Sequence, residues 1–279
     1  MEHEYEVIET PIKYDDIVFP ETLYKYRDWS KINNRTILTN REVFFASPKS
    51  FVDPIDCKNF SRWDLLTYED LLNKYFKRSQ EINKNYNYYQ HMEWATKWAN
   101  ESPINNKEFV RERQEKDFLD YNIRLGVLSL TEFNNLTEMW DMYSNGHTGF
   151  CVGFDPNIML RNMGTGGGKV RYYDELPVIY PTPKHSFSMQ MNLQVFCKLK
   201  EWEFEQEYRT YKFSINPLTL NNRIQIVPPE AYKELIFGAK IPDKVVKAII
   251  DSLPKEIGHL EKKLKRAQLI DNVIEIVNY

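Results

Sequence analysis

The sequence Trp-Glu-Phe-Glu-Gln-Glu-Tyr-Arg, residues 202–209, decides both the fold and the chemistry that we expect of this chain. Aromatic and charged residues alternate in and beyond it, which is typical of a β-strand with one buried and one polar face. On a strand over residues 204–213, Glu205, Glu207 and Arg209 point to the same side, opposite to the aromatic side chains. We therefore expect a late strand that presents two carboxylates and one guanidinium on one surface.

This trio of charged side chains suits acid–base chemistry. Two neighbouring carboxylates repel each other, which raises the pKa of one of them, while Arg209 stabilises the ionised form of its neighbour. One proton-transferring group and one permanent anion then share a site. Glu205, Glu207 and Arg209 are thus the candidate catalytic residues, and the alternative is a solvated strand face or an ion-pair ladder.

Short apolar or alternating runs predict further strands that lie far apart along the chain. We expect strands at residues 23–27, 42–46, 125–130, 149–154, 169–173, 224–227, 234–237, 262–270 and 273–277. Helical patterns occur at residues 138–143, 186–199 and 242–253. Strands separated irregularly by helices are typical of an α+β fold with a mixed, mainly antiparallel sheet, and not of repeating βαβ units.

Residues 63–121 differ in character from the rest of the chain. Charged and aromatic residues recur there at spacings of three and four with almost no Gly or Pro, which predicts two or three amphipathic helices. A chain of 279 residues fits one large domain that carries an insertion. We therefore expect a single α+β domain over residues 1–279 with a helical insertion at residues 63–121.

The composition excludes several classes of protein. Hydrophobic residues make up 42% and charged residues 28%, which is too apolar for a disordered protein and too evenly charged for a membrane protein. No apolar run approaches the roughly 20 residues of a membrane span, and residues 1–4 lack the basic start of a signal peptide. We expect a cytoplasmic protein without a membrane partner. Its net charge of −3 gives no overall attraction to nucleic acid.

Sequence signatures of common cofactor sites are absent. There is no GxGxxG after an expected strand and no GxxxxGK[ST] loop. The three cysteines are an odd number without a CxxC pair, so we expect reduced thiols instead of disulfides or a cysteine-rich zinc site. His91, His185 and His259 have no ligand-like spacing, and we expect no metal.

Four segments resemble the motifs of a bacterial family catalogued as domain of unknown function 2971 (DUF2971). They are residues 23–27 with 44–48 and 51–56, residues 128–130 with 139–143 and 147–154, residues 169–172, and residues 202–209. The family pattern has Asn where Val52 stands in this chain. Since the family carries no agreed activity, this resemblance implies a shared fold and little chemistry.

The order of these parts also resembles that of ADP-ribosyltransferases that use NAD. In those enzymes an Arg or His on an early strand holds the dinucleotide, a middle Ser or Tyr packs the nicotinamide, and a late strand carries the glutamate. The resemblance implies that Arg27, with its neighbour Tyr26, takes the first role. Ser129 or Tyr143 takes the second, and the pair of glutamates at 205 and 207 takes the last.

Cleavage of the nicotinamide bond gives the physical reason for a late glutamate. The reaction builds an oxocarbenium-like cation, which a fixed carboxylate bonded to the ribose hydroxyl stabilises. A second carboxylate two residues away can then deprotonate the acceptor. The resemblance thus implies an ADP-ribosyltransferase or NAD glycohydrolase, and we expect it to serve as a toxin or an anti-phage defence effector. Its expected partners are a nucleic-acid or protein acceptor and a regulatory protein.

Two other functions use the same residues. A metal-dependent nuclease would place Asp53 or Asp56 with Glu205 or Glu207 on Mg²⁺, and Arg209 beside the scissile phosphate. This arrangement departs from the usual nuclease pattern, because Arg replaces Lys and the helical insertion separates the acids. A non-enzymatic interaction module would instead use the charges as surface ion pairs and the aromatic helices as contacts for another protein.

Several of these residues also have structural explanations. Trp140 and Tyr143, three apart on the expected helix, are candidate cofactor-binding residues, but such a pair more often forms core or cleft wall. Asp53 and Asp56 flank a proline, which favours a turn whose carboxylates cap backbone N–H groups. For His147 we expect a hydrogen-bonded loop position.

Overall fold

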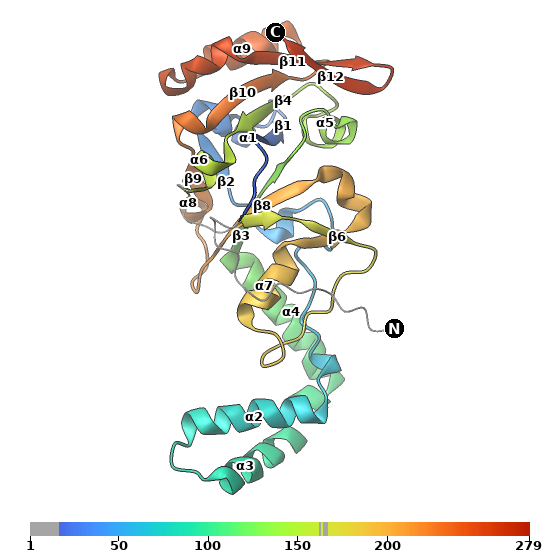
Figure 1. The fold of residues 1–279 in the computed structure, drawn as a ribbon, viewed down its shortest axis with the longest axis vertical. Coiled ribbons are helices and arrows are strands. Elements are labelled where there is room, and N and C mark those ends of the chain that lie inside the picture. Colours follow the sequence, from blue (N-terminus) through green and yellow to red (C-terminus); the bar gives the residue numbers. More distant parts are fainter. Residues whose placement is uncertain (1–16, 162, 164–166) are drawn as a thin grey trace.

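A computed structural model describes residues 17–161, 163 and 167–279 (Figure 1). The strands are β1 (Leu23–Arg27), β2 (Glu42–Phe44), β3 (Leu125–Thr131), β4 (Phe150–Phe154), β5 (Gly167–Lys169), β6 (Arg171–Tyr173), β7 (Cys197–Leu199), β8 (Glu207–Phe213), β9 (Ile224–Ile226), β10 (Tyr232–Phe237), β11 (Leu264–Ile270) and β12 (Val273–Asn278). The α-helices are α1 (Ile32–Thr39), α2 (Tyr68–Ile82), α3 (Tyr88–Asn100), α4 (Lys107–Arg124), α5 (Thr137–Tyr143), α6 (Pro156–Arg161), α7 (Phe187–Val195), α8 (Leu220–Arg223) and α9 (Asp243–Asp251). Short 3₁₀ helices are η2 (Pro48–Ser50), η3 (Trp63–Leu65), η4 (Pro103–Asn105), η5 (Lys200–Glu205), η6 (Pro229–Ala231) and η7 (Lys255–Lys262).

Eight strands form the main sheet in the order β12-β11-β10-β4-β1-β3-β8-β5. The β10–β11 pair is parallel, and the other neighbours in this sheet run antiparallel. Two-stranded sheets join β2 with β9 and β6 with β7. The predicted α+β class with a mixed, mainly antiparallel sheet is therefore confirmed.

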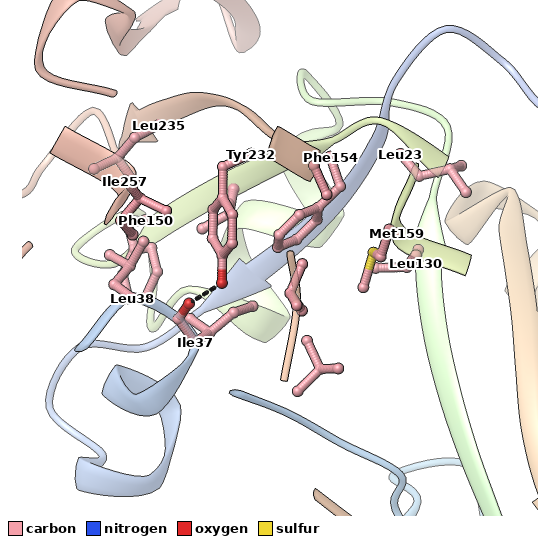
Figure 2. Close-up of a cluster of buried hydrophobic side chains, with 14 of the residues drawn as sticks. Leu23, Ile37, Leu38, Leu130, Phe150, Phe154, Met159, Tyr232, Leu235 and Ile257 are labelled. Carbon is pink, nitrogen blue, oxygen red and sulfur yellow. Dashed lines mark hydrogen bonds between the residues drawn. The ribbon is translucent and has the colours of Figure 1, made fainter. Parts of the chain in front are cut away.

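The central strand β4 anchors the main hydrophobic core. All five of its residues are buried, because its neighbours β1 and β10 cover both of its edges and other elements cover both faces. Phe150 and Phe154 pack with buried side chains from β1, α1, β10 and η7, as Figure 2 shows. Burying one such ring stabilises the fold by about 1.5–3 kcal/mol. The hydroxyl of Tyr232 crosses this core and donates a hydrogen bond of 2.6 Å to the Ile37 carbonyl (Figure 2).

The main sheet divides between β1 and β3. β1 pairs with β4 along all five of its residues, but it meets β3 at one residue pair, Tyr24 with Thr131. β3 instead pairs along its whole length with β8. In Figure 1, β1 lies with β4 and β10, whereas β3 runs away from them beside β8. The main sheet therefore forks between β1 and β3.

The helices predicted between residues 63 and 121 are present as α2, α3 and α4. Figure 1 shows α2 and α3 side by side, far from the main sheet and joined to it through α4. Both helices begin with a capping box, at Thr67 and at Asn87, in which side chain and backbone satisfy each other's hydrogen bonds. A buried hydrogen bond of 2.8 Å between Ser79 and the Nδ1 atom of His91 joins them. None of the helices in the described part of the chain has the length and apolar character that a membrane span needs.

The strand predicted at residues 204–213 begins at Glu207, because residues 200–205 form η5. Gln206 adopts the left-handed conformation, with φ 41° and ψ 55°, and ends that 3₁₀ helix. Its backbone N–H donates to the Glu203 carbonyl at 3.1 Å, and its side-chain amide donates to the same oxygen at 2.7 Å. Local hydrogen bonding therefore overrides the alternating pattern over these residues.

Two other predicted elements are also divided. The helix expected at residues 186–199 ends at Val195, and the last residues form β7, parallel to β6. The strand expected at residues 169–173 is two strands, β5 and β6, which pair with different partners. Val170 lies between them and donates its N–H to the Glu207 carbonyl at 2.8 Å. These changes bring β7 and η5 next to the start of β8.

Candidate active site

A cavity of about 540 Å³ lies at the fork between β1 and β3. Its polar lining includes Lys25, Arg27, Ser129, Tyr143, Lys198, Glu205 and Glu207. Apolar and aromatic side chains from β2, the loop after η2, α8 and β9 form another part of the wall, and α1 and η2 add uncharged polar side chains. A mostly apolar hollow with a few convergent polar groups is typical of a small-molecule site.

Glu205 and Glu207 converge at this cavity, although not as neighbours on one strand. Glu205 ends η5, and the left-handed turn at Gln206 redirects the chain so that both carboxylates meet the same lysine. The ammonium of Lys198 on β7 donates to Oε2 of Glu205 and, at 3.2 Å, to Oε1 of Glu207. The hydroxyl of Tyr143 donates to Oε1 of Glu205. Both glutamates are buried, which is the opposite of the convex, exposed ion pairs that an interaction module would use.

Arg209 binds Glu207 from the side that faces away from the cavity. Its Nε donates to Oε2 of Glu207 at 2.6 Å. Its two terminal nitrogens donate to the two carboxylate oxygens of Asp56 at 2.7 and 2.6 Å, a bidentate pair. Arg209 is 2% exposed and is not among the residues that line the cavity. The predicted catalytic arginine is thus a positioning residue, since it reaches the cavity only through Glu207.

The buried cluster contains two cations and three carboxyl groups, so its charges balance when one carboxyl group is protonated. Lys198 and Arg209 face the carboxylates of Asp56 and Glu207, and Glu205 is the additional acid. Burial, and then the hydrogen bond and negative charge of Glu207, raise the pKa of Glu205 to about 8 against the opposing charge of Lys198. Glu205 is therefore mostly protonated at neutral pH.

Glu207 keeps its charge. Burial alone would raise its pKa, but the charge of Arg209, a hydrogen bond from Glu205 and the charge of Lys198 outweigh it and hold the pKa well below the ordinary value. One group that can exchange a proton near neutral pH therefore lies beside one permanent anion. That division of roles is the one that the sequence predicts for this pair.

Lys25 and Arg27 bring positive charge to the cavity from β1. Burial, with the nearby charge of Arg27, lowers the pKa of Lys25 to about 7. Burial likewise lowers the pKa of Arg27 to about 10. Lys25 donates to the Ser129 carbonyl, and Arg27 makes a long bond of 3.4 Å to the Tyr26 carbonyl. Within the described ranges, neither cation has a carboxylate at ion-pair distance.

The predicted cofactor-binding residues divide into two groups. Arg27, Tyr26, Ser129 and Tyr143 line the cavity, as the sequence leads us to expect. Tyr26 is 2% exposed, because its hydroxyl turns away to donate to the Phe133 carbonyl at 2.9 Å. It therefore borders the cavity mainly as a wall.

The structure places Trp140 in the core and not in the cavity. Its side chain is fully buried, and its indole N–H donates to the Asn134 carbonyl at 2.9 Å. The ring packs edge-on against Tyr26, with centroids 5.0 Å apart, and lies parallel to the His147 ring. Trp140 thus supports the cavity wall from the far side of Tyr26.

The three loop residues considered in the sequence, Asp53, Asp56 and His147, have different roles in the structure. Asp53 accepts a hydrogen bond of 2.9 Å from the Ile55 N–H, which is the turn cap that the sequence suggests. Asp56 instead leaves the turn and pairs with Arg209. His147 is buried in a loop with φ 67° and lies 2.9 Å from an Asp141 carboxylate oxygen, as expected for a hydrogen-bonded loop histidine.

Two residues of the site, Lys198 and Lys25, are not in the sequence-based set, and Asp56 is in it as a candidate metal ligand or turn cap. Lys198 is a lone charge within the apolar run from Val195 to Leu199, a pattern that signals a buried partner. Lys25 lies two residues before Arg27 and so shares its face of the strand. The sequence groups Asp56 with the late charged residues only through the nuclease alternative, whereas the structure pairs it directly with Arg209.

The carboxylates around the cavity are poorly arranged to bind a metal ion. Within the described ranges, no group of three or more His, Cys, Asp or Glu side chains is arranged to hold an ion. Asp56 and Glu207 already form ion pairs with Arg209 and Lys198, whose positive charges would repel Mg²⁺. This geometry disfavours the metal-dependent nuclease.

Comparison with known proteins adds a family but no activity. No curated protein and no solved structure matches the chain. A family model described as "Protein of unknown function (DUF2971)" matches residues 139–210. This segment contains Tyr143, Lys198 and both glutamates of the cavity. Over residues 139–210, the chain therefore carries the sequence pattern of the DUF2971 family, which confirms the resemblance for the motifs within this segment.

Proposed function

We propose that this protein is an NAD-consuming enzyme, a glycohydrolase or an ADP-ribosyltransferase. The observation that carries the proposal is the meeting of Glu205, Glu207 and the Arg27 strand at one cavity. A volume of about 540 Å³ lies within the range of ligand sites for molecules of this class. The aromatic side chains of Phe44 and Phe51 line the same hollow and suit the flat rings of a dinucleotide.

Glu207 is suited to stabilise the ribosyl cation. When the bond between nicotinamide and ribose breaks, its electron pair leaves with the nicotinamide nitrogen, and positive charge develops at the ribose carbon. An ionised carboxylate that is already fixed in place lowers the energy of that charge without reorganising. Lys198 and Arg209 provide the fixing, because each holds Glu207 through a direct hydrogen bond.

Glu205 is suited to accept the proton of the attacking group. Water or an acceptor hydroxyl forms the new bond to the ribose carbon and must lose one proton. With a pKa of about 8, Glu205 keeps its proton in most molecules at neutral pH, and the minority that have released it carry a stronger base than an ordinary glutamate. Lys198 and Tyr143 orient its carboxyl group.

The proposal is tested by incubating the purified chain with NAD and measuring released nicotinamide. We expect release by the wild type and its loss in Glu207→Gln. Glu203→Gln is the matched control, since Glu203 is exposed four residues away and should remain fully active. Thermal unfolding of both variants separates lost chemistry from lost fold. Absence of nicotinamide release and of transfer to protein or nucleic-acid acceptors would contradict the proposal.

The same activity accounts for the biological role that we propose, a toxin or anti-phage defence effector acting in the cytoplasm. NAD loss stops metabolism, so such an enzyme requires restraint by a partner. Expression in bacteria should lower cellular NAD and growth, and expression of Glu207→Gln should not. Equal growth inhibition by both proteins would remove this role.

A further inference from the structure

A second pocket, of about 180 Å³, lies at the base of the helical insertion, where η3, α2, η4 and α4 meet. Lys74 of α2 and Arg113 of α4 are its charged residues, and no Asp or Glu of the described chain lines it. The rest of its wall consists of Trp63, Tyr75, Pro103, Ile104, Phe109 and Val110. The pocket therefore combines positive charge with an apolar and aromatic wall.

Lys74 is half-buried and has no carboxylate at ion-pair distance among the residues that the structure describes. Asp70, one helical turn earlier on α2, is its natural partner by spacing. The carboxylate of Asp70 is instead engaged elsewhere, since it accepts from the Thr67 N–H at 2.9 Å and lies 3.6 Å from the Lys184 ammonium. The Lys74 ammonium lies 4.5 Å from the centroid of the Trp63 ring, which offsets only part of a positive charge.

Arg113 and Trp63 also have N–H groups without acceptors. The Nε atom of Arg113 donates to Asp117 at 3.0 Å, but in the described part of the chain its two terminal nitrogens donate to nothing. The indole N–H of Trp63 is buried and likewise has no acceptor there. Burial, and then the charge of Arg113, lower the pKa of Lys74, as expected for two cations without an anion between them. Because buried N–H groups nearly always have acceptors, these three residues together favour a ligand with several negatively charged oxygens.

We infer that this pocket binds a phosphate monoester carried on a flat apolar group. Such a phosphate has a charge of about −1.5 to −2 at pH 7 and three acceptor oxygens, which matches two cations and one indole N–H. Arg113 offers a planar fork to it and Lys74 a compact charge. The aromatic wall suits a flat apolar group, and the volume lies below the roughly 300–1,000 Å³ of drug-sized sites, so the ligand is small. Because the two cations belong to different helices, the bound phosphate would connect α2 to α4.

The test follows the indole N–H signals of the full chain by NMR after isotopic labelling of its 6 tryptophans. Trp63→Phe identifies the Trp63 signal by its loss. We expect phenyl phosphate to shift this signal with a Kd of about 1 mM or lower. Phenol, which has no charge, and benzoate, which has one, should bind at least about tenfold more weakly. No shift of the Trp63 signal, or equal affinity for phenol or benzoate, overturns the inference and leaves the two cations a packing role on the Trp63 ring.

Variants assign the binding to the two cations. Lys74→Met should weaken phenyl phosphate binding at least about tenfold, because it removes one charge and keeps an apolar chain against the Trp63 ring. Lys77→Met is the matched control on the same helix, since Lys77 is exposed and does not line the pocket, and it should leave the affinity unchanged. Arg113→Gln tests the other cation, even if the Lys74 variant fails to fold. Wild-type affinity in a folded Lys74→Met or Arg113→Gln protein overturns the inference.

Two further ligands define the source of the phosphate and its selectivity. Tighter binding of a phosphotyrosine peptide than of phenyl phosphate assigns the phosphate to a protein partner, and weaker binding assigns it to a free small molecule. ADP-ribose, the part of NAD that remains after nicotinamide leaves, contains no phosphate monoester and should not shift the Trp63 signal at the same concentration. An equal shift with ADP-ribose overturns the inference. The result is independent of NAD cleavage, because the pocket shares no residue with the cavity between β1 and β3.

Discussion

At the scale of single residues, the proton shared between Glu205 and Glu207 governs the behaviour of the site. The two carboxyl groups are hydrogen-bonded to each other and to Lys198. Arg209 keeps the charge on Glu207, so the proton resides on Glu205. This division creates pH dependences in both activity and stability.

The rate of NAD cleavage or transfer should rise as pH passes through about 8. Glu205 acts as a base in the proposed reaction, and its ionised fraction grows through its raised pKa. In Glu205→Gln we expect kcat to fall by about 10² or more and to lose this rise. The measurement is kcat against pH from 6 to 9.5 for both proteins. An identical slope in the variant would show that another group sets the profile.

The free energy of unfolding should fall as pH rises from about 5 to 7. The folded state raises the pKa of Glu205 above its ordinary value, so folding keeps a proton that the unfolded chain has already released over this range. The stabilisation is complete below the ordinary pKa and is lost as pH passes through about 8. Urea unfolding of Glu205→Gln should give a flatter dependence over this window. Lys25 contributes little there, since it is mainly protonated in both states below pH 7.

Removing the carboxylate charge of Asp56 should destabilise the fold strongly. Asp56→Asn breaks a bidentate ion pair and leaves the Arg209 guanidinium buried without it, a change that costs about 3–5 kcal/mol. Asp64→Asn is the matched control, because Asp64 forms an exposed pair with Arg62 that contributes about 0–1 kcal/mol. Denaturant midpoints of the two variants measure the contrast, and equal midpoints would contradict the buried network.

The sequence predicts which residues of β8 matter, but not their geometry. The spacing of Glu205 and Glu207 correctly suggests that they share a surface, yet the strand alternation used to infer it is wrong at residue 206. Lys198 and Asp56 enter from distant segments, and their contacts depend on the packing of β7 and the loop after η2. Such long-range contacts leave no periodic signal in one sequence.

At the scale of elements, β1 links the core to the cavity. Its Leu23 is fully buried, whereas Lys25 and Arg27 line the hollow. The strands β1 and β3 agree closely with the sequence-based prediction, because β1 alternates aromatic and charged residues and β3 is a short apolar run. The 3₁₀ helix η5 is not predicted, because its charged and aromatic residues also fit a strand. Only the hydrogen bonds of the folded chain decide between a strand and a 3₁₀ helix at these residues.

The end of β1 depends on close contact with Gly149. A Cβ atom at this position would lie 2.2 Å from the Arg27 carbonyl oxygen and 2.9 Å from that of Ser144. Gly149→Ala should therefore shift the backbone at Arg27, lower stability by about 1–3 kcal/mol and weaken ADP-ribose binding. Gly258→Ala meets nothing within 4 Å and is the control. Thermal unfolding and calorimetry compare the two variants, and wild-type behaviour of Gly149→Ala would contradict this packing.

At the scale of the whole molecule, the helical pair α2 and α3 stands apart from the sheet that holds the cavity (Figure 1). Its position is consistent with its sequence, where capped amphipathic helices pack mainly on each other. The order of the eight strands is not predictable in the same way. β4 lies between β1 and β10, which are about 200 residues apart in the sequence, and only the folded core specifies that arrangement.

Replacing residues 67–105 by a short Gly-Ser linker should leave the cavity intact. The segments on either side lie close together, since the Arg113 guanidinium lies 5.4 Å from the centroid of the Trp63 ring. We expect a folded protein whose ADP-ribose affinity changes by less than about threefold. Calorimetry and circular dichroism check both points. A large loss of affinity in a folded variant would place part of the binding site on α2 or α3.

The strands β1 and β3 are joined at the single pair Tyr24 and Thr131, beside the cavity where a ligand would sit. A tilt of the two halves of the sheet against each other would disturb this one pair and leave the strand pairing within each half intact. A dinucleotide that touches Arg27 on one side and Glu207 on the other would clamp them together. The bound ligand would thereby connect β1 to the β3–β8 half of the sheet where backbone pairing is sparse, so the sheet would be more rigid when the cavity is occupied.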